Sequence, residues 1–295
     1  MTRGSRAKRR PSTTHLNHGS HRHRGGSRRL RRAALFGLVA AACALVAVGA
    51  WLATGALSRE GPAPKAAIVD QLGLLTPNPT FVEAATDILE QAGYAVDYYP
   101  AEEVTVDFYR DLPGHGYELI VLRVHSAVPG RDLTIASKVP EPTLESVLRA
   151  ISDDVVLFTS EPYSESRYLD EQRALRLFPV RDYEENPGEG YFAIGSDFIG
   201  SSMKGRFDQT TVVLMGCSGL ASDRTAAAFA QRGAGAVVGW SGLVSAPHTD
   251  AANELLLRRL LIDGLPTQEA VARTAAEVGP DPEYGSTLLV YPSKG

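Results

Sequence analysis

Cysteine is nearly absent from this chain, whose 295 residues include only two, Cys43 and Cys217. Cys43 lies in an apolar segment near the N-terminus, where we expect it simply to pack, so the rest of the chain holds a single thiol. One thiol forms no disulfide within its own domain. In an exported protein such a cysteine either pairs with another chain or is reactive. Cys217 is therefore a candidate reactive residue.

Two further absences argue against whole classes of function. His, Cys and acidic residues never occur at a spacing that resembles a metal-ligand set, which disfavours a metal hydrolase. No Gly-rich phosphate loop follows the first expected strand, 66–70, and no acidic pair accompanies Asp70 at its end. A flavodoxin-like or receiver-like regulatory domain is therefore a poor fit. We predict no metal and no other cofactor.

Acidic residues are missing from residues 1–32, which hold eleven of the chain's 30 Lys and Arg. The remainder carries 19 bases against 34 acids, a balance of −15. The basic tail is rich in Ser, Gly and His, so we predict that it is disordered, with its four histidines in solvent rather than on a metal. A basic tail can indicate nucleic acid, but the segment that follows explains the charge without it.

Charged residues are also missing from 33–57, an apolar stretch of 25 positions with Trp51 near its far end. About 20 apolar residues suffice for a helix to cross a bilayer, and an indole suits the interface. The stretch therefore predicts one transmembrane helix, and the arginines within 28–32 predict a cytoplasmic N-terminus. The domain that follows is then extracytoplasmic. A cleaved signal peptide and a twin-arginine signal are the alternatives.

Beyond a Pro-containing linker at 58–65, residues 66–295 are predicted to form an α/β domain. Long apolar runs are typical of strands buried on both faces of a parallel sheet, and here they alternate with segments of helical period. We expect a three-layer sandwich around a mostly parallel sheet, with a hairpin extension or a loop between 161 and 191. The expected strands are 66–70, 95–100, 117–126, 155–161, 191–195, 210–217, 234–242 and 286–292, and the expected helices are 81–94, 104–113, 222–233, 249–264 and 267–279.

Two reactive side chains end buried strands of this predicted sheet. His125 ends the run 117–126, and Cys217 ends the run 210–217. The carboxyl ends of parallel strands gather at one edge, where binding and chemistry occur, so we expect these two distant residues to meet there. The other histidines of the domain are less suitable, because His115 precedes a strand and His248 opens a helix.

This pair suits nucleophilic catalysis. A thiol attacks as the thiolate, and a neighbouring imidazole or helix N-terminus promotes that form. Gly216 and Gly219 flank the thiol and allow a sharp turn, whose N–H groups can hold an oxyanion. His125 is then expected to protonate the leaving amine. A buried filler cysteine and a structural histidine are the alternative interpretation.

The chain resembles the caspase-like cysteine peptidases, in particular gingipain-type and CHAT-type members, in the stretches YELIVLRVHS, TTVVLMGCSGL, AAAFAQRGAGAVVGW and LLIDGLPTQEA. The resemblance implies that His125 is the general acid/base and Cys217 the nucleophile, and that the backbone amides of Ser126 and Cys217 hold the oxyanion. Two positions depart from the family pattern. Ser126 stands where Gly is usual, and Gly216 stands where Ala is frequent.

The resemblance also implies a substrate pocket within residues 240–250. Trp240 and Ser241 would line it, and Asp250 would pair with a basic substrate residue. Core packing is the alternative for Trp240, and a position at a helix start is the alternative for Asp250.

Together these features predict a membrane-anchored, extracytoplasmic cysteine endopeptidase that hydrolyses peptide bonds with a Cys/His dyad. Its expected partners are a peptide or protein substrate and, through one helix, the membrane, with no nucleic acid. A catalytically inactive caspase-like module that binds a peptide or protein at the cell surface is the alternative. The sequence leaves the substrate, any need for Ca²⁺ or proteolytic activation, and the oligomeric state open.

Overall fold

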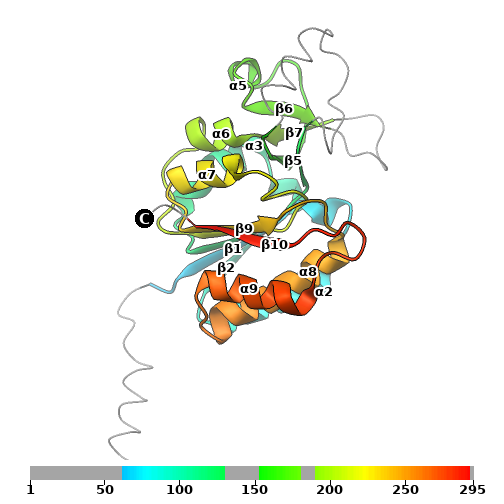
Figure 1. Ribbon diagram of the computed structural model, residues 1–295. Helices are drawn as coiled ribbons and strands as arrows, with labels where there is room; N and C mark the ends of the chain where they lie inside the picture. Colours follow the sequence, from blue (N-terminus) through cyan, green and yellow to red (C-terminus); the bar gives the residue numbers. More distant parts are fainter. Residues whose placement is uncertain (1–61, 130–152, 181–189, 293–295) are drawn as a thin grey trace, which may run out of the picture. The chain divides into compact units, whose positions relative to one another are not determined.

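A six-stranded, mostly parallel sheet forms the centre of the structure, a computed structural model that describes residues 62–129, 153–180 and 190–292 (Figure 1). The strand order is β10-β9-β8-β3-β1-β2, and only β10 runs antiparallel to its neighbour. The strands are β1 (Lys65–Asp70), β2 (Ala95–Pro100), β3 (Leu119–Arg123), β8 (Thr211–Leu214), β9 (Ala236–Trp240) and β10 (Leu288–Pro292). This confirms the predicted α/β class and mostly parallel sheet.

The predicted N-terminal features are not part of the described structure. The basic tail 1–32, the apolar span 33–57 and the first residues of the linker 58–65 all lie outside the described residues. Within the ranges that the structure does describe, no helix has both the length and the apolar character needed to cross a membrane.

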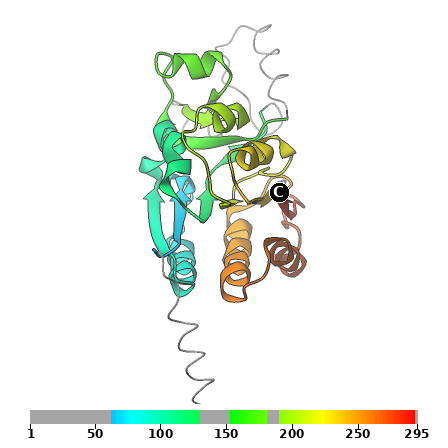
Figure 2. The same ribbon diagram turned by 90° about the vertical axis from the view of Figure 1, so that its left-hand side faces the viewer.

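Helices cover both faces of the central sheet (Figures 1 and 2). On one face α2, α8 and α9 pack with Ile68 and Val238 in one hydrophobic core, and on the other α3, α6 and α7 pack with Val69 and Leu122 in a second core. This layering is compatible with a three-layer sandwich. The helices are α2 (Pro79–Gln91), α3 (Val106–Asp111), α5 (Leu169–Arg173), α6 (Ser196–Ser201), α7 (Asp223–Gln231), α8 (Ala246–Leu257) and α9 (Thr267–Val278), with 3-10 turns η1 (Gln71–Leu74), η2 (Ala101–Glu103) and η3 (Leu112–His115) and the π-helix η4 (Arg258–Ile262).

A second, antiparallel sheet stands beside the helices α3 and α6 (Figure 1). Its strand order is β4-β5-β7-β6, and it has its own small core around Val156, Phe158 and Phe178. Its strands are β4 (Ser126–Ala127), β5 (Val156–Pro162), β6 (Leu177–Val180) and β7 (Tyr191–Ile194). The sequence predicted strands near β5 and β7, but it did not predict that they pair in a separate sheet.

The apolar run 117–126 is divided between the two sheets, which corrects the expectation of one long strand. The central strand β3 ends at Arg123, and Ser126 already belongs to β4 of the second sheet. His125 therefore lies in the short link where the chain crosses from one sheet to the other. Similarly, the expected helix 249–264 is α8 followed by the π-helix η4.

Local sequence signals fix the ends of α7 as predicted. The hydroxyl of Ser222 accepts a hydrogen bond from the backbone N–H of Arg224 and so caps the first turn. At the other end Gly233 has a φ of +110°, in the region that glycine adopts without strain, and a Cβ there would lie 2.1 Å from the carbonyl oxygen of Phe207. Glycine is therefore required at 233.

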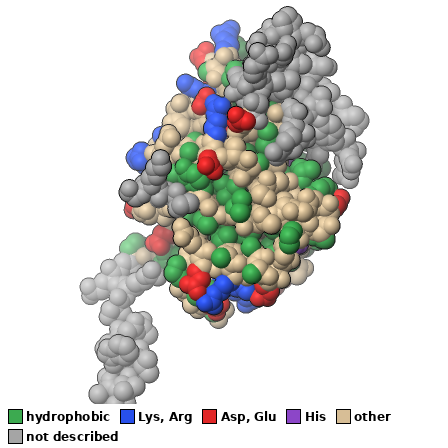
Figure 3. Space-filling model, in the orientation of Figure 1, with side chains coloured by type: hydrophobic (Ala, Val, Ile, Leu, Met, Phe, Trp, Pro, Cys, Tyr) green, Lys and Arg blue, Asp and Glu red, His purple; other side chains and the backbone are tan. Residues whose placement is uncertain are grey.

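The edge strand β10 lies on the face of the molecule shown in Figure 3. Charged side chains on that face gather toward its upper and lower ends, and the band between them is mainly uncharged and hydrophobic. The strand itself, with the sequence LLVYP, carries no charge, and Leu289 is 42% exposed. This edge therefore lacks the charged side chains that usually discourage pairing with another strand.

Candidate cysteine–histidine site

The register of β3 and β8 brings His125 and Cys217 to the same edge of the central sheet. Leu122 of β3 pairs with Leu214 of β8, and the N–H of Met215 donates to the carbonyl of Leu122 at 2.9 Å. His125 and Cys217 each stand three residues beyond this pair. Because the strands are parallel and adjacent, both side chains follow carboxyl ends at one edge, where ligands bind in open α/β sheets.

The turns that carry the two residues are in direct contact. The hydroxyl of Ser126 donates to the carbonyl oxygen of Cys217 at 2.6 Å. Gly216 packs against the same link, since a Cβ at this position would lie 2.2 Å from the carbonyl oxygen of Val124 and 2.3 Å from the hydroxyl oxygen of Ser126. The two departures from the family pattern therefore face each other, and the Ser126 hydroxyl takes space that a methyl group at 216 would need.

The turn after Cys217 is tight and locally strained. Ser218 is fully buried and has a φ of +59°, which costs a residue other than glycine roughly 1–3 kcal/mol. Its N–H donates to the carbonyl of Gly242 at 2.7 Å, which holds it in place. Gly219 approaches the backbone of β9, with its would-be Cβ 3.6 Å from the Cα of Gly239. Backbone strain of this kind is found most often at functional sites.

Cys217 carries a half-buried thiol with polar neighbours. The backbone N–H of Val244 points at Sγ from 3.5 Å, and the carbonyl oxygen of Val244 lies 3.6 Å from it. As a thiol the group can donate to the carbonyl, and as a thiolate it can accept from the N–H.

The backbone of His125 is held on both sides. Its N–H donates to the side-chain oxygen of Gln71 at 2.8 Å, and its carbonyl accepts from the N–H of Phe158 at 2.9 Å. The imidazole packs at 5.7 Å from the ring of Phe158 and is half-buried. The backbone that carries the imidazole is therefore held by η1 on one side and by β5 on the other.

The same contacts orient the amide of Ser126. Ser126 pairs with Leu157 in the antiparallel β4–β5 ladder, and the bond from Phe158 to His125 makes this a pair that exchanges no hydrogen bonds. The N–H of Ser126 therefore points away from β5. It faces Gly216, whose would-be Cβ lies 3.1 Å from the Ser126 nitrogen.

The three predicted pocket residues are engaged elsewhere. Trp240 is fully buried, and its indole N–H donates to the hydroxyl of Thr249 at 2.9 Å. The Ser241 hydroxyl accepts from the N–H of Thr287 at 3.0 Å. Asp250 is 6% exposed, and it accepts two hydrogen bonds from the guanidinium of Arg123. The indole of Trp240 and the carboxylate of Asp250 are therefore bonded inside the fold, and the Ser241 hydroxyl is bonded to the residue before β10.

A buried ion cluster that sequence reasoning missed lies directly before His125. Arg123 is fully buried and bonds Asp70 at 2.7 Å and Asp250 at 2.9 Å. Burial alone would lower the pKa of Arg123, but the hydrogen bonds that it donates to Asp250 and Asp70 raise it above its usual value. The available signal was an arginine inside the otherwise apolar run LIVLRVHS.

Tyr284 is a second residue that the sequence did not single out. It belongs to the loop before β10, is 47% exposed and lies within electrostatic reach of Cys217. Its pKa is raised first by the hydrogen bond with Glu283, then by burial, and further by negative charge on Glu283 and on the Cys217 sulfur. A partly exposed aromatic ring thus lies within electrostatic range of the thiol.

Asp281 organises the loop that carries Tyr284. Its carboxylate accepts hydrogen bonds from the N–H and the hydroxyl of Ser245 and from the N–H groups of Glu283 and Tyr284, all within 2.9 Å. Burial by itself would raise the pKa of Asp281, but these hydrogen bonds lower it below its usual 3.8. The ionised carboxylate therefore stabilises the loop.

Replacing Asp281 with asparagine is expected to lower the free energy of unfolding at pH 7 by about 1.5 kcal/mol. A carboxylate whose pKa is lowered by folding contributes fully above its usual pKa, and the contribution is lost as the pH falls through the folded-state value. The deficit of Asp281→Asn should therefore be complete at pH 7 and shrink below about pH 4. Urea unfolding at pH 7 and at pH 3 measures the deficit. The exposed Asp263→Asn serves as the control, and an equal deficit at pH 7 and pH 3 would contradict the assignment.

Comparison with known proteins assigns no family. No protein-family model matches the chain, and no curated protein matches it either.

Proposed function

We propose that this chain is a cysteine endopeptidase resembling the caspase-like peptidases, with Cys217 as nucleophile and His125 as general acid/base. The observation that carries the proposal is the equal offset of the two residues beyond the paired Leu122 and Leu214, in turns joined by the bond from Ser126 to Cys217. Two reactive groups 92 positions apart in the sequence thereby share one edge.

The reaction uses groups that these turns present. The Cys217 thiolate adds to the carbonyl carbon of the scissile peptide, and the C–N bond breaks as the leaving amine takes a proton from the His125 imidazolium. Water, losing a proton to His125, then hydrolyses the thioester, which releases the acid and restores the thiolate and the imidazolium. The N–H of Ser126, which points away from β5, is the proposed oxyanion donor together with that of Cys217.

The sequence adds a location to the proposed activity. The apolar stretch 33–57, preceded by arginines and followed by an acidic domain, supports a single-pass protein with an extracytoplasmic catalytic domain. The substrate class is a peptide or a protein. The exposed ring of Tyr284 is a candidate contact for it beside the thiol.

Thiol reactivity tests the dyad. In a Cys43→Ser background, Cys217 should react rapidly with iodoacetamide at pH 7, and His125→Ala should slow the reaction about tenfold because the thiolate loses its imidazolium partner. His115→Ala removes an exposed histidine that precedes β3 and should change nothing. Mass spectrometry of the alkylated cysteine gives the rates.

The outcome separates the two functions that the sequence left open. A slow thiol that is indifferent to His125→Ala would contradict the peptidase and favour a module that only binds a peptide or a protein. Cleavage of a mixed peptide library by the parent, and none by Cys217→Ala, would support hydrolysis directly.

A further inference from the structure

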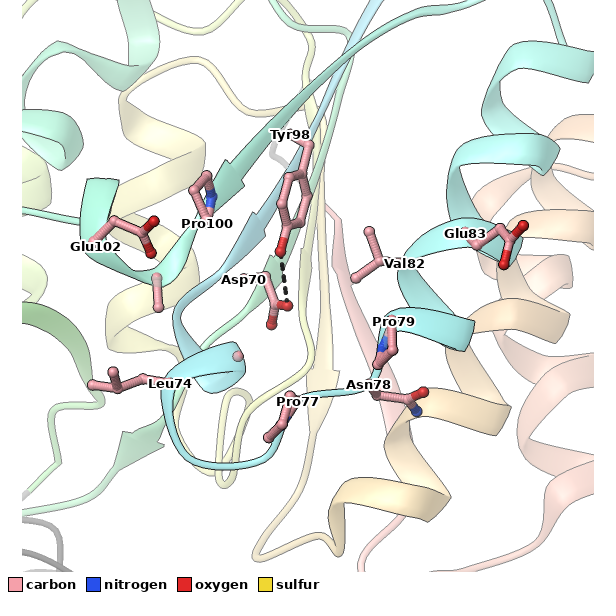
Figure 4. Close-up of a pocket in the computed structure, with 12 residues that line it drawn as sticks. Asp70, Leu74, Pro77, Asn78, Pro79, Val82, Glu83, Tyr98, Pro100 and Glu102 are labelled. Atoms are coloured by element: carbon pink, nitrogen blue, oxygen red, sulfur yellow. Dashed lines mark hydrogen bonds between the residues drawn. The ribbon is translucent and has the colours of Figure 1, made fainter.

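A cavity of about 720 Å³ opens at the carboxyl ends of β1 and β2 (Figure 4). Its walls come from the turns η1 and η2 and from the start of α2, and they contain three prolines, Pro77, Pro79 and Pro100. Its volume lies within the range of small-ligand sites. Prolines keep such walls rigid, because their φ angles are fixed.

Asp70 is one of the lining residues, and its carboxylate is almost fully buried next to Tyr98 (Figure 4). Its Oδ1 accepts from Arg123, and its Oδ2 accepts from the Tyr98 hydroxyl at 3.3 Å (Figure 4). Gly73, another lining residue, keeps space open beside Oδ2, since a Cβ there would lie 2.8 Å from that oxygen. A carboxylate oxygen can accept more than one hydrogen bond, so Oδ2 has capacity for a ligand.

The charges around the cavity do not balance. Arg123 carries one positive charge against the two buried carboxylates of Asp70 and Asp250. Glu102 and Glu83 add two exposed carboxylates to the lining, which contains no cation. Burial and then the charge of Asp70, with Glu102 adding to it, raise the pKa of Tyr98, and Arg123 opposes this. The electrostatic potential at the Tyr98 hydroxyl is therefore negative.

The shape of the lining selects among cations. Among the residues that the structure describes, no three His, Cys, Asp or Glu lie close enough together to hold a metal ion. The walls are instead apolar, with Leu74 and Val82, and the ring of Tyr98 is 45% exposed. A ring face of this kind attracts an organic cation.

We propose that this cavity binds a guanidinium or ammonium group on an aliphatic stem, with Asp70 Oδ2 as its anchor and Glu102 and the Tyr98 ring beside it. The stem packs against Leu74 and Val82. The group comes either from a free amine or from an arginine or lysine side chain of a peptide. This inference stands apart from the proposed peptidase, because it requires neither Cys217 nor His125.

Calorimetric titration of the full chain in mild detergent, with Cys217→Ala as background, tests the proposal. The probes are agmatine, an arginine-containing pentapeptide with blocked ends, and the same peptide with citrulline in place of arginine. Binding of agmatine identifies a free amine as sufficient, and binding of the arginine peptide but not of agmatine identifies a peptide side chain. Citrulline carries no positive charge, so the citrulline peptide should bind weakly, and its binding should not depend on the salt concentration.

Matched variants locate the site. Glu102→Gln should weaken binding about two- to fivefold, whereas Glu103→Gln removes an equal, exposed charge outside the lining and should leave it unchanged. Tyr98→Leu should weaken it about threefold, and Gly73→Val should abolish it by filling the space beside Oδ2. If Gly73→Val fails to fold, the exposed variants Glu102→Gln, Glu103→Gln and Tyr98→Leu still test the proposal.

Three results would overturn the proposal. These are no binding of either cationic probe up to about 10 mM, equal losses in Glu102→Gln and Glu103→Gln, and displacement of agmatine by micromolar Ca²⁺. Binding is measured in the Cys217→Ala background, so an absence of binding leaves the peptidase proposal standing. Likewise, failure of the peptidase proposal leaves this binding site standing.

Discussion

Arg123→Met is expected to lower the free energy of unfolding at pH 7 by about 3–5 kcal/mol. Arg123 is fully buried between Asp70 and Asp250, and methionine leaves both carboxylates buried without a cation. Unpaired buried carboxylates are stabilised by protonation, so their pKa values should rise in the variant. The deficit should then be smaller at pH 5 than at pH 7, because the folded variant takes up protons that the unfolded chain does not.

Urea unfolding of parent and variant at the two pH values measures this effect. Arg258→Met is the matched control, since Arg258 pairs with Glu254 on an exposed helix surface and should cost less than about 1 kcal/mol. Adding Asp250→Asn to Arg123→Met should recover part of the loss, because it removes one of the two unpaired charges. A deficit no larger than that of Arg258→Met would show that the cluster contributes little.

Gly216→Ala is expected to cost about 3 kcal/mol, at the upper end of overpacking effects. The new methyl group would overlap the Val124 carbonyl oxygen at 2.2 Å and the Ser126 hydroxyl oxygen at 2.3 Å. The φ of Gly216 is not among the positive values, so the cost comes from contact rather than from backbone strain. The link that carries His125 has to shift away from Cys217.

A double-mutant cycle with Ser126→Gly tests this explanation. Removing the hydroxyl relieves one of the two overlaps, so the double variant should recover about 1 kcal/mol relative to the sum of the single changes. The overlap with the Val124 carbonyl remains, which is why recovery is incomplete. Urea unfolding gives the coupling, and iodoacetamide rates report whether the two turns stay together. Strictly additive effects would mean that Ser126 and Gly216 do not share this space.

The central sheet was predictable because its strands are mainly apolar runs bounded by turn residues. All six strands of that sheet overlap the expected segments, and Ser222 and Gly233 marked the ends of α7 correctly. The register that aligns His125 with Cys217 was expected from parallel pairing alone. In these cases local pattern and tertiary packing select the same structure.

The remaining features depend on contacts between distant residues. β4 has two residues, and its pairing with β5 is set by tertiary packing rather than by a pattern in its sequence. The partners of Arg123 lie 53 and 127 positions away, and no local period predicts them. Trp240 and Asp250 were ambiguous for the same reason, since only the fold decides whether such residues line a pocket or fill a core. The cavity beside Asp70 requires Gly73, whose role is visible only in three dimensions.

Because the run 117–126 is divided between two sheets, the imidazole of His125 and the sulfur of Cys217 are held by different sheets. Cys217 follows β8 and lies in the turn that packs against β9, whereas the carbonyl of His125 is bonded to β5 and Ser126 pairs with β5 in the second sheet. A small rotation of one sheet against the other would thus change the distance between the imidazole of His125 and the sulfur of Cys217 without altering either side chain. The hydrogen bond from the Ser126 hydroxyl to the Cys217 carbonyl connects the two turns and so opposes this rotation.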